Sequence, residues 1–249
     1  LSGGCAYNGT ANGKILKKTK FQNIWIPPAP SDAGSSIGVA LESFYKGIDI
    51  DRHDNTNPYL GPDYSKQDML KALNDYHLDV YYEWKPSDVL IPYTAELIAE
   101  NNIIGWFQGR MEFGPRALGA RSILGDPRSE NMQKNLNLKV KYRESFRPFA
   151  PSVLENEVTD WFNIDKISPY MLMVANVNKD KVIKMSDDEE KLFGIEKLNI
   201  KRSTIPAVTH VDYSARIQTV NQKTNQRYFN LISKFHKKTG CPILINTSF

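Results

Sequence analysis

The stretch IIGWFQGRMEFGPRALGARSIL, residues 103–124, joins an apolar run to a segment rich in glycine and arginine. Its first five residues, 103–107, predict a buried strand that leads into an irregular backbone. The following segment is interrupted by Gly109, Gly114, Pro115 and Gly119. Such a backbone exposes amide groups beside Arg116 and Arg121, and amides with guanidinium groups suit bidentate recognition of phosphate oxygens. For either arginine taken alone, an ordinary surface charge is the alternative interpretation.

The composition of the 249 residues is that of a globular chain, since 41% are hydrophobic, which is enough for one large domain or two smaller ones. Two distant cysteines, Cys5 and Cys241, make no disulfide framework, which favours the cytoplasm. No apolar run approaches the roughly 20 residues of a membrane helix, and no signal peptide is recognisable. The chain begins without methionine in a glycine-rich turn and stops after a strand-like run, so we expect a piece of a longer protein.

Positive charge is concentrated in one part of the chain. The whole sequence has a net charge of +4, and residues 105–152 contain nine Lys or Arg against four Asp or Glu. That segment therefore holds more net positive charge than the complete chain does. Such a concentration indicates an anionic partner, either a nucleic acid or the phosphate groups of a small molecule.

The N-terminal part predicts a strand followed by two helices. Residues 24–26 alternate as in a strand, and the sequence PPAPSDAG then interrupts the pattern. Apolar residues at helical spacing from Ile37 to Phe44 predict a helix that Gly47 ends. The sequence SKQD at Ser65 resembles a capping box before a second amphipathic helix.

A connector rich in proline, aspartate and asparagine, residues 51–64, marks the predicted domain boundary. We therefore predict two units, residues 1–52 and residues 58–249. A second, highly charged connector at 178–201 predicts a solvent-exposed excursion without a chemical role.

The remaining pattern mixes helices and strands, which predicts an α/β chain of mixed α+β type. Strands are predicted at Val80, Tyr82 and Trp84, at 169–177, at 205–211 and, as a buried strand, at 241–245. Helices are predicted at 93–101 and at 226–240, the latter ending at Gly240.

Polar residues in three further segments complete the candidate site. Lys141 and Arg147 lie before the apolar sequence FAPSVL, so Arg147 needs an anionic partner or a place at the rim. Asn246 and Ser248 share one face if the last strand continues, and ligands bind at the carboxyl ends of strands in open α/β sheets. Arg216 is the last candidate. A solvated charge run and an ordinary turn remain the alternatives for these segments.

Together these segments resemble the ATP-dependent O-carbamoyltransferases, the group of nodulation, cephalosporin and aminoglycoside carbamoyltransferases. Four motifs resemble the C-terminal region of that family: GRMEFGPRALGARSILGDPR, KVKYRESFRPFAPSVL, PAVTHVDYSARIQTV and CPILINTSF. The opening LSGGCAYNGTANGKI and the later APSDAGSSIG are similar to the end of its N-terminal domain.

The resemblance implies a fold and an activity. Residues 1–52 would be a fragment of an actin-like ATPase-fold domain, and residues 58–249 an α/β domain like that of threonylcarbamoyl-adenylate synthases. In the family, the second domain combines ATP and carbamoyl phosphate into carbamoyl-adenylate, releasing pyrophosphate and phosphate. The first domain then passes the carbamoyl group to a hydroxyl of a small-molecule or glycan acceptor.

The resemblance also implies site residues. The carbamoyl-adenylate site would comprise Arg116, Lys141, Arg147, Arg216, Asn246 and Ser248. Asp32 matches the aspartate that helps to bind a divalent metal, iron or magnesium, in the full-length enzymes. The family's histidine pair has no counterpart among the four histidines, so we expect an incomplete metal site. Gly4, Asn8 and Asn12 match positions in the nucleotide cleft of the first domain, with a structural role as the open alternative.

A second hypothesis is a nucleic-acid-binding or tRNA-modifying protein, because of the basic segment. No RNA-binding module signature supports it. A third hypothesis is a catalytically silent interaction domain. The sequence indicates no membrane partner and leaves a homodimer open.

Overall fold

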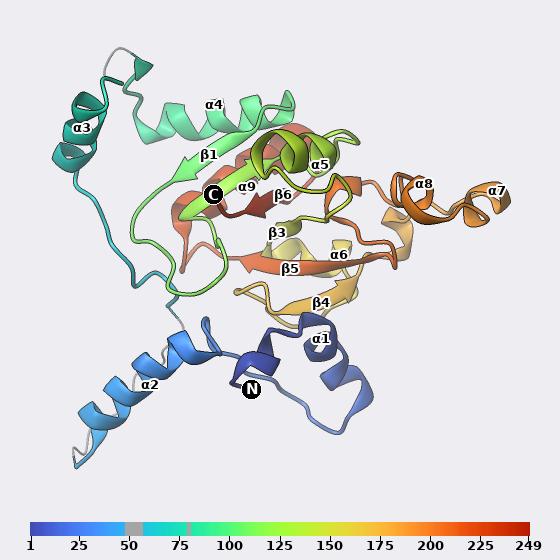
Figure 1. The fold of residues 1–249 in the computed structure, drawn as a ribbon, viewed down its shortest axis with the longest axis horizontal. Coiled ribbons are helices and arrows are strands. Elements are labelled where there is room, and N and C mark those ends of the chain that lie inside the picture. The colour runs from blue at the N-terminus through green and yellow to red at the C-terminus, as the bar shows by residue number, and fades with distance from the viewer. Residues whose placement is uncertain (48–56, 79–80) are drawn as a thin grey trace.

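A six-stranded mixed sheet forms the centre of the molecule (Figure 1). This computed structural model describes residues 1–47, 57–78 and 81–249. The strands are β1 (Ile104–Phe107), β2 (Arg121–Gly125), β3 (Ala150–Leu154), β4 (Met173–Asn176), β5 (Ser214–Val220) and β6 (Ile243–Thr247). They lie in the order β1-β2-β6-β3-β5-β4, in which β3 and β5 run parallel and the other neighbours antiparallel. The predicted mixed α/β class is therefore confirmed.

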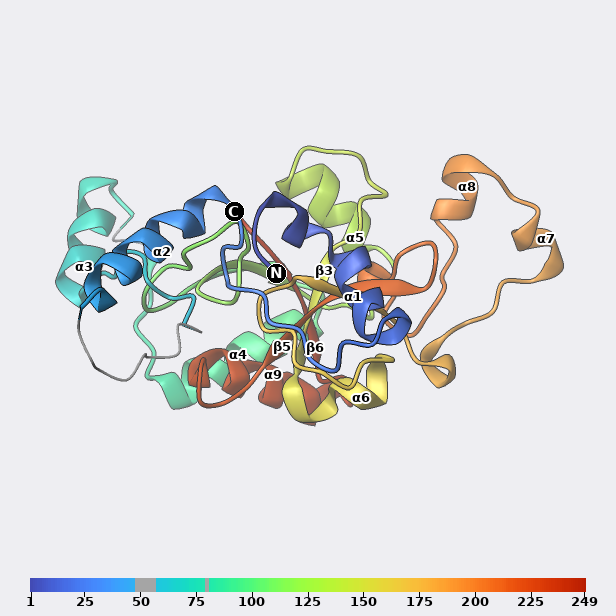
Figure 2. The same cartoon turned by 90° about the horizontal axis from the view of Figure 1, so that it is seen from below.

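Helices cover both faces of this sheet. The α-helices are α1 (Gly9–Lys18), α2 (Asp32–Tyr45), α3 (Lys66–Asp75), α4 (Ser87–Ala99), α5 (Met132–Asn135), α6 (Val158–Trp161), α7 (Asp187–Glu190), α8 (Gly194–Leu198) and α9 (Gln226–Thr239). Figure 2 shows α4, α9 and α6 on one side of the sheet and α5 on the other. Helices α2 and α3 extend away from the sheet, as do α7 and α8 in the charged connector (Figure 1).

The core lies between the sheet and α9. Tyr228, Leu231, Ile232 and Phe235 recur at helical spacing along α9, and all four are fully buried. The helix ends where Gly240 adopts φ 75°, a left-handed cap that glycine reaches without strain. Strand β6 is buried along its apolar residues. The predictions for 226–240 and 241–245 are thus confirmed.

Helix α1 packs against the outer edge of β4, at the end of the sheet (Figure 1). The side chain of Asn12 is buried there and donates from Nδ2 to the carbonyl oxygens of Ala6 and Leu172. The helix approaches so closely that a Cβ at Gly13 would lie 1.9 Å from the Val174 carbonyl oxygen. Because an open strand edge is prone to pair with other chains, α1 also protects this edge. Residue 52, the predicted end of the first unit, lies outside the described residues, and the two-unit division stays a prediction.

Other helix predictions are confirmed with small changes of boundary. Helix α2 contains the predicted apolar positions and ends before Gly47. Ser65 and Asp68 form the predicted capping box of α3. The helix predicted at 93–101 begins earlier, at Ser87, and Pro92 lies inside it. Residues 183–201 of the charged connector are largely exposed, as predicted.

Three strand predictions are wrong. Residues 24–26 belong to no strand, and Pro27 and Pro28, which follow directly, have no amide hydrogen to donate to a neighbouring strand. Residues 205–211 begin instead with the 3₁₀ turn Pro206–Val208, which the proline starts. Tyr82 and Trp84 belong to no strand, while Val80 lies outside the described residues.

The sheet contains three strands that the sequence pattern did not predict, β2, β3 and β5. Strand β3 is buried at every residue and β5 at nearly every residue. Full burial removes the two-residue alternation by which strands are recognised. In contrast, β1 is an edge strand with Phe107 exposed, so its predicted burial is wrong for every residue except Trp106.

Two further sequence inferences concern the whole chain. Cys5 and Cys241 are both free thiols. Among the described helices, none is both long and apolar enough to cross a membrane.

We predict that Gly13→Ala lowers the free energy of unfolding by about 1–3 kcal/mol, the usual cost of overpacking, because the new methyl group must displace α1 from β4. Gly38→Ala in the exposed part of α2 is the matched control, because nothing lies within 4 Å of its Cβ position. There the substitution should stabilise by up to about 1 kcal/mol. Urea unfolding followed by circular dichroism measures both values, and equal effects would contradict the close packing of α1.

Candidate functional site

A cavity of about 340 Å³ lies where β6 ends and β3 begins. Its basic lining residues are Arg116, Lys141, Arg143, Arg147 and Arg216. The polar residues Asn246, Thr247 and Ser248 line the same cavity, together with apolar residues that include Met171 and Phe149. No carboxylate belongs to this described lining. The cavity is therefore built to receive a ligand with several negative charges.

All six residues predicted for the carbamoyl-adenylate site line this one cavity. They come from the loop before β2, the loop before β3, β5 itself and the end of β6. The structure thus brings together side chains that lie up to 132 positions apart in the sequence, from Arg116 to Ser248. Their roles in binding or catalysis stay predictions.

Burial and neighbouring positive charges lower the pKa of several basic side chains in the cavity. Burial, together with the nearby charges of Arg116 and Arg143, lowers the pKa of Arg216 to about 10. The pKa of Lys141 is also lowered, first by burial and then by Arg143. Burial likewise lowers the pKa of Arg116. The protein therefore holds these charges at a cost that an anionic ligand would relieve.

Three residues that line this cavity each have a buried polar atom without a hydrogen-bond partner in the described part of the chain. These atoms are Nε of Arg116, Nε of Arg216 and Oδ1 of Asn246. Buried polar groups in folded proteins are nearly always paired, and leaving one unpaired costs about 1–3 kcal/mol. Two donors and one acceptor on residues that line one cavity are thus left with unused hydrogen-bonding capacity.

The loop before β3 is organised by Asn137, which the sequence analysis missed. Its buried side chain donates to the carbonyl oxygens of Ser145 and Arg147 and accepts from Nε of Arg143 at 2.7 Å. Arg143 was not predicted either, although it lies between Lys141 and Arg147 in the same basic motif. Its guanidinium also lies over the ring of Phe149, 5.0 Å from the centroid.

Arg147 and Lys141 occupy the outer part of the cavity. Arg147 is half exposed and pairs with Glu144 at 2.6 Å, so it has both the rim position and the anionic partner that the sequence required. This pairing raises the pKa of Arg147. The Lys141 ammonium donates to the Ser248 carbonyl oxygen at 2.5 Å, which joins the basic loop to the end of β6.

The interpretation of Arg121 as a phosphate ligand is wrong. Its guanidinium donates to carbonyl oxygens of the surrounding loops, among them those of Gln108 and Gly109, and lies 3.5 Å from the centroid of the Phe107 ring. The predicted exposed amides are also occupied. Oε1 of the buried Glu112 accepts from the amides of Leu118 and Ala120, both at 2.7 Å, and from that of Arg121 at 3.3 Å. The protein's own carboxylate therefore holds this loop together.

Asn246 does not lie at an edge where only the carboxyl ends of strands meet, as the sequence predicted. The sheet is mainly antiparallel, so the carboxyl end of β6 lies beside the start of β3, where Asn246 pairs with Ala150. The cavity therefore opens among strand ends of both directions. Strand β6 ends at Thr247, yet Ser248 still lines the cavity.

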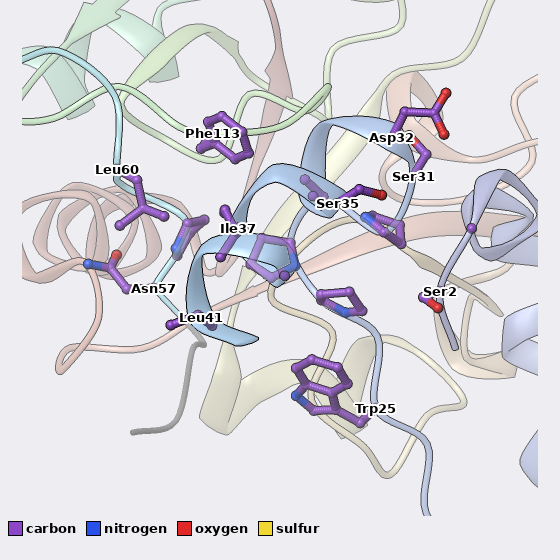
Figure 3. Close-up of a pocket in the computed structure, with 18 residues that line it drawn as sticks. Ser2, Trp25, Ser31, Asp32, Ser35, Ile37, Leu41, Asn57, Leu60 and Phe113 are labelled. Carbon is purple, nitrogen blue, oxygen red and sulfur yellow. The ribbon is translucent and has the colours of Figure 1, made fainter. Parts of the chain in front are cut away.

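The residues around Asp32 do not fit a metal site. Asp32 starts α2 at the margin of a second cavity of about 510 Å³ with largely apolar walls. In Figure 3 its carboxylate points away from Ile37 and Leu41. No cluster of three His, Cys, Asp or Glu side chains suited to a metal occurs in the described ranges.

Asn8 and Asn12 have structural roles. Asn8 caps α1 by accepting from the amide of Ala11, and Asn12 attaches α1 to the sheet domain. Neither residue lines the cavity beside Asp32, and Gly4 does not line it either. The structural alternative for these three residues is favoured.

The fold and the cavity define an α/β protein with one compact, strongly basic cavity at the strand ends. The chain belongs to the carbamoyltransferase family: the carbamoyltransferase C-terminus model matches residues 95–249 and the carbamoyltransferase N-terminus model matches residues 1–41. The family resemblance deduced from the motifs is thereby confirmed.

Three relatives illustrate the similarity. Over the whole chain, the sequence is 50% identical to an uncharacterized protein of Synechocystis and 40% identical to nodulation protein NolO of Bradyrhizobium diazoefficiens. It is 33% identical to nodulation protein U of Rhizobium tropici. The matched region makes up 41%, 42% and 37% of these relatives, respectively, so the chain spans about two fifths of their length.

We predict that pyrophosphate raises the melting temperature, because it neutralises the repelling cations. At a concentration of 100 times the dissociation constant, the stabilisation would be about 2.7 kcal/mol. Differential scanning fluorimetry measures the shift, which sodium chloride should reduce. Arg227→Gln, an exposed arginine outside this cavity, is the control and should leave the shift unchanged. A wild-type chain that does not respond to pyrophosphate would contradict the anion site.

We also predict that Arg216→Gln stabilises the ligand-free chain and weakens the pyrophosphate response. A base whose pKa is lowered by folding destabilises the folded state at all pH values below that pKa. The advantage of the variant should therefore be complete below about pH 10 and should shrink as the pH rises from about 10 toward 12.5. Urea unfolding at pH 8 and pH 11 measures this difference. A stability difference between Arg216→Gln and the wild type that grows with pH would contradict this prediction.

Proposed function

We propose that this chain contains the carbamoyl-adenylate-forming site of an ATP-dependent O-carbamoyltransferase. The observation that supports it is the single cavity lined by five cations. Among its lining residues, Nε of Arg116 and Arg216 and Oδ1 of Asn246 are buried and have no partner within the described residues. The substrates would be ATP and carbamoyl phosphate, and the products carbamoyl-adenylate, pyrophosphate and phosphate.

The charges of the two substrates support this assignment. ATP and carbamoyl phosphate together bring about six negative charges, and hydrogen bonds to charged groups stabilise by about 1.5–3 kcal/mol each. Repulsion between two anions opposes their encounter, so a site that joins them must supply several cations at once. Attack at the α-phosphate also develops charge on the departing pyrophosphate, which fixed arginine and lysine side chains would stabilise.

The arrangement suggests a division of roles. Arg116 and Arg216 are the more buried cations and would bind phosphoryl oxygens through their free Nε groups. Lys141 and Arg147 lie nearer the opening and would bind the more mobile phosphate groups. Asn246 and Ser248 would orient the carbamoyl group or the ribose instead of neutralising charge.

Transfer of the carbamoyl group to an acceptor hydroxyl is proposed for the longer protein. The chain spans about two fifths of the length of its relatives, and the acceptor site would need the actin-like domain of which residues 1–52 are the predicted fragment. Helix α1 packs directly on β4, so this fragment would be attached firmly to the domain that makes the adenylate.

We predict that Lys141→Ala and Arg147→Ala each weaken binding of carbamoyl phosphate and ATP by tenfold or more, as loss of a charged hydrogen bond of about 1.5–3 kcal/mol implies. Both variants should keep the wild-type melting temperature to within a few degrees, because neither side chain is part of the core. Isothermal titration calorimetry measures the affinities. Lys139→Ala is the matched control, since Lys139 is exposed and does not line the cavity.

Unchanged binding of both substrates in both variants would refute the proposal. Release of pyrophosphate by the wild-type chain, seen only when both substrates are present, would support adenylate formation directly. The nucleic-acid hypothesis has a different signature. It requires tight RNA binding that falls steeply with salt, whereas a cavity of about 340 Å³ suits small phosphates.

A further inference from the structure

Two buried side-chain amides connect the cavity to the loop before β2. Asn246 lies on β6 and donates from Nδ2 to the Ala117 carbonyl oxygen at 3.1 Å and to Oε1 of Gln218 at 2.9 Å. Gln218 lies on β5 and donates from Nε2 to the Leu118 carbonyl oxygen at 2.9 Å. Ser152 completes the group by donating to Oε1 of Gln218 at 2.5 Å. Asn246, Gln218 and Ser152 are all at least 98% buried.

The direction of each amide follows from the backbone. A main-chain carbonyl can only accept, so Leu118 requires the NH₂ end of Gln218 on its side. Oε1 of Gln218 must then face Asn246, which therefore turns its own NH₂ group toward Gln218 and Ala117. Two backbone carbonyls thus determine the orientation of both amides, and neither can reverse without placing oxygen against oxygen.

In this orientation the Asn246 side chain can form a further hydrogen bond only as an acceptor, through Oδ1. Both of its N–H groups are used, and Oδ1 is buried without a partner among residues 1–47, 57–78 and 81–249. Asn246 lines the cavity, where the charged groups are donors. An anionic oxygen would gain nothing from a second oxygen, so the part of the ligand beside Asn246 must present a donor.

We propose that Gln218 is a positioning residue that holds Asn246 as a hydrogen-bond acceptor, so that the cavity selects an acyl phosphate that has an N–H group over one that does not. The inference rests on the proposed function and deepens it. A carbamoyl group has an NH₂ donor, whereas the acetyl group of acetyl phosphate presents a methyl group of similar size. The methyl group would leave Oδ1 of Asn246 desolvated and unpaired.

Gln218 does not line the cavity, so its effect must pass through Asn246. Without Gln218, the Asn246 amide would keep the single bond to Ala117, and one N–H would lose its partner. The amide could then rotate and offer either a donor or an acceptor to the ligand. Selection for an N–H group should therefore fall, while binding of the phosphate group by the cations should continue.

Calorimetric titration of the full chain with carbamoyl phosphate, acetyl phosphate and inorganic phosphate tests the proposal. The wild-type chain should bind carbamoyl phosphate at least about tenfold more tightly than acetyl phosphate, as the loss of one hydrogen bond to a buried acceptor implies. In Gln218→Leu this ratio should fall to within about twofold of unity, since only the hydrogen-bond selection is removed. The affinity for inorganic phosphate should stay within about twofold of the wild-type value, because the cations are unchanged.

Ser152→Ala is the control that distinguishes loss of the contact between Gln218 and Asn246 from general destabilisation of the core. It removes a hydrogen bond from the same buried group but leaves the contact between Gln218 and Asn246 in place. This variant should lose stability and keep the wild-type ratio. If Gln218→Leu does not fold, Asn246→Ala provides the second test, because removing the acceptor itself should also abolish the preference for carbamoyl phosphate.

Each outcome has a definite meaning. A wild-type chain that binds none of the three ligands refutes the proposed function. A wild-type chain that binds both acyl phosphates equally leaves the anion site intact and refutes the inference. A wild-type preference that persists in folded Gln218→Leu, or that is lost equally in Ser152→Ala, refutes the positioning role of Gln218.

Discussion

Repulsion among five cationic side chains in one small cavity is the constraint on which the rest of this site depends. Hydrogen bonds from uncharged side chains, not ion pairs, mainly hold the cavity walls together against this repulsion. No carboxylate lies in the described lining, and Glu144 pairs with Arg147 only at the rim. Asn137 holds the basic loop, and the pair Asn246 and Gln218 joins β6 and β5 to the opposite loop. The positive potential is thus preserved for a ligand, at the cost of lowered pKa values for Arg216 and Lys141.

The buried carboxylate of Glu112 holds the backbone near this region. Glu112 accepts hydrogen bonds from three backbone amides in and next to the loop that carries Arg116. The loop is therefore held in place without a bound phosphate. Gly119 lies in the same loop at φ 101°, and a Cβ there would lie 2.3 Å from the ring of Tyr228. The loop therefore packs tightly on α9, which links the position of Arg116 to the main core.

Helix α1 extends this arrangement to the N-terminal segment. Asn12 bonds to the Leu172 carbonyl oxygen, and the neighbouring Met171 lines the cavity. Tyr7 lies under the Arg116 guanidinium, with the ring centroid 6.0 Å away. The segment that matches the carbamoyltransferase N-terminus therefore contacts the wall of the cavity formed by the C-terminal part.

The sequence by itself determined the family, the mixed α/β class, the amphipathic helix α9, the buried strand β6 and the six residues of the cavity, because these depend on local pattern or on motifs. The residue pattern without the family motifs did not separate Arg116 from Arg121, which lie five positions apart, and neither pattern nor motifs identified Asn137 and Gln218. The pattern also missed β3 and β5, whose burial hides alternation. Only the tertiary structure decided these points, because the partner of a buried polar group is set by whichever distant backbone atoms the fold brings against it.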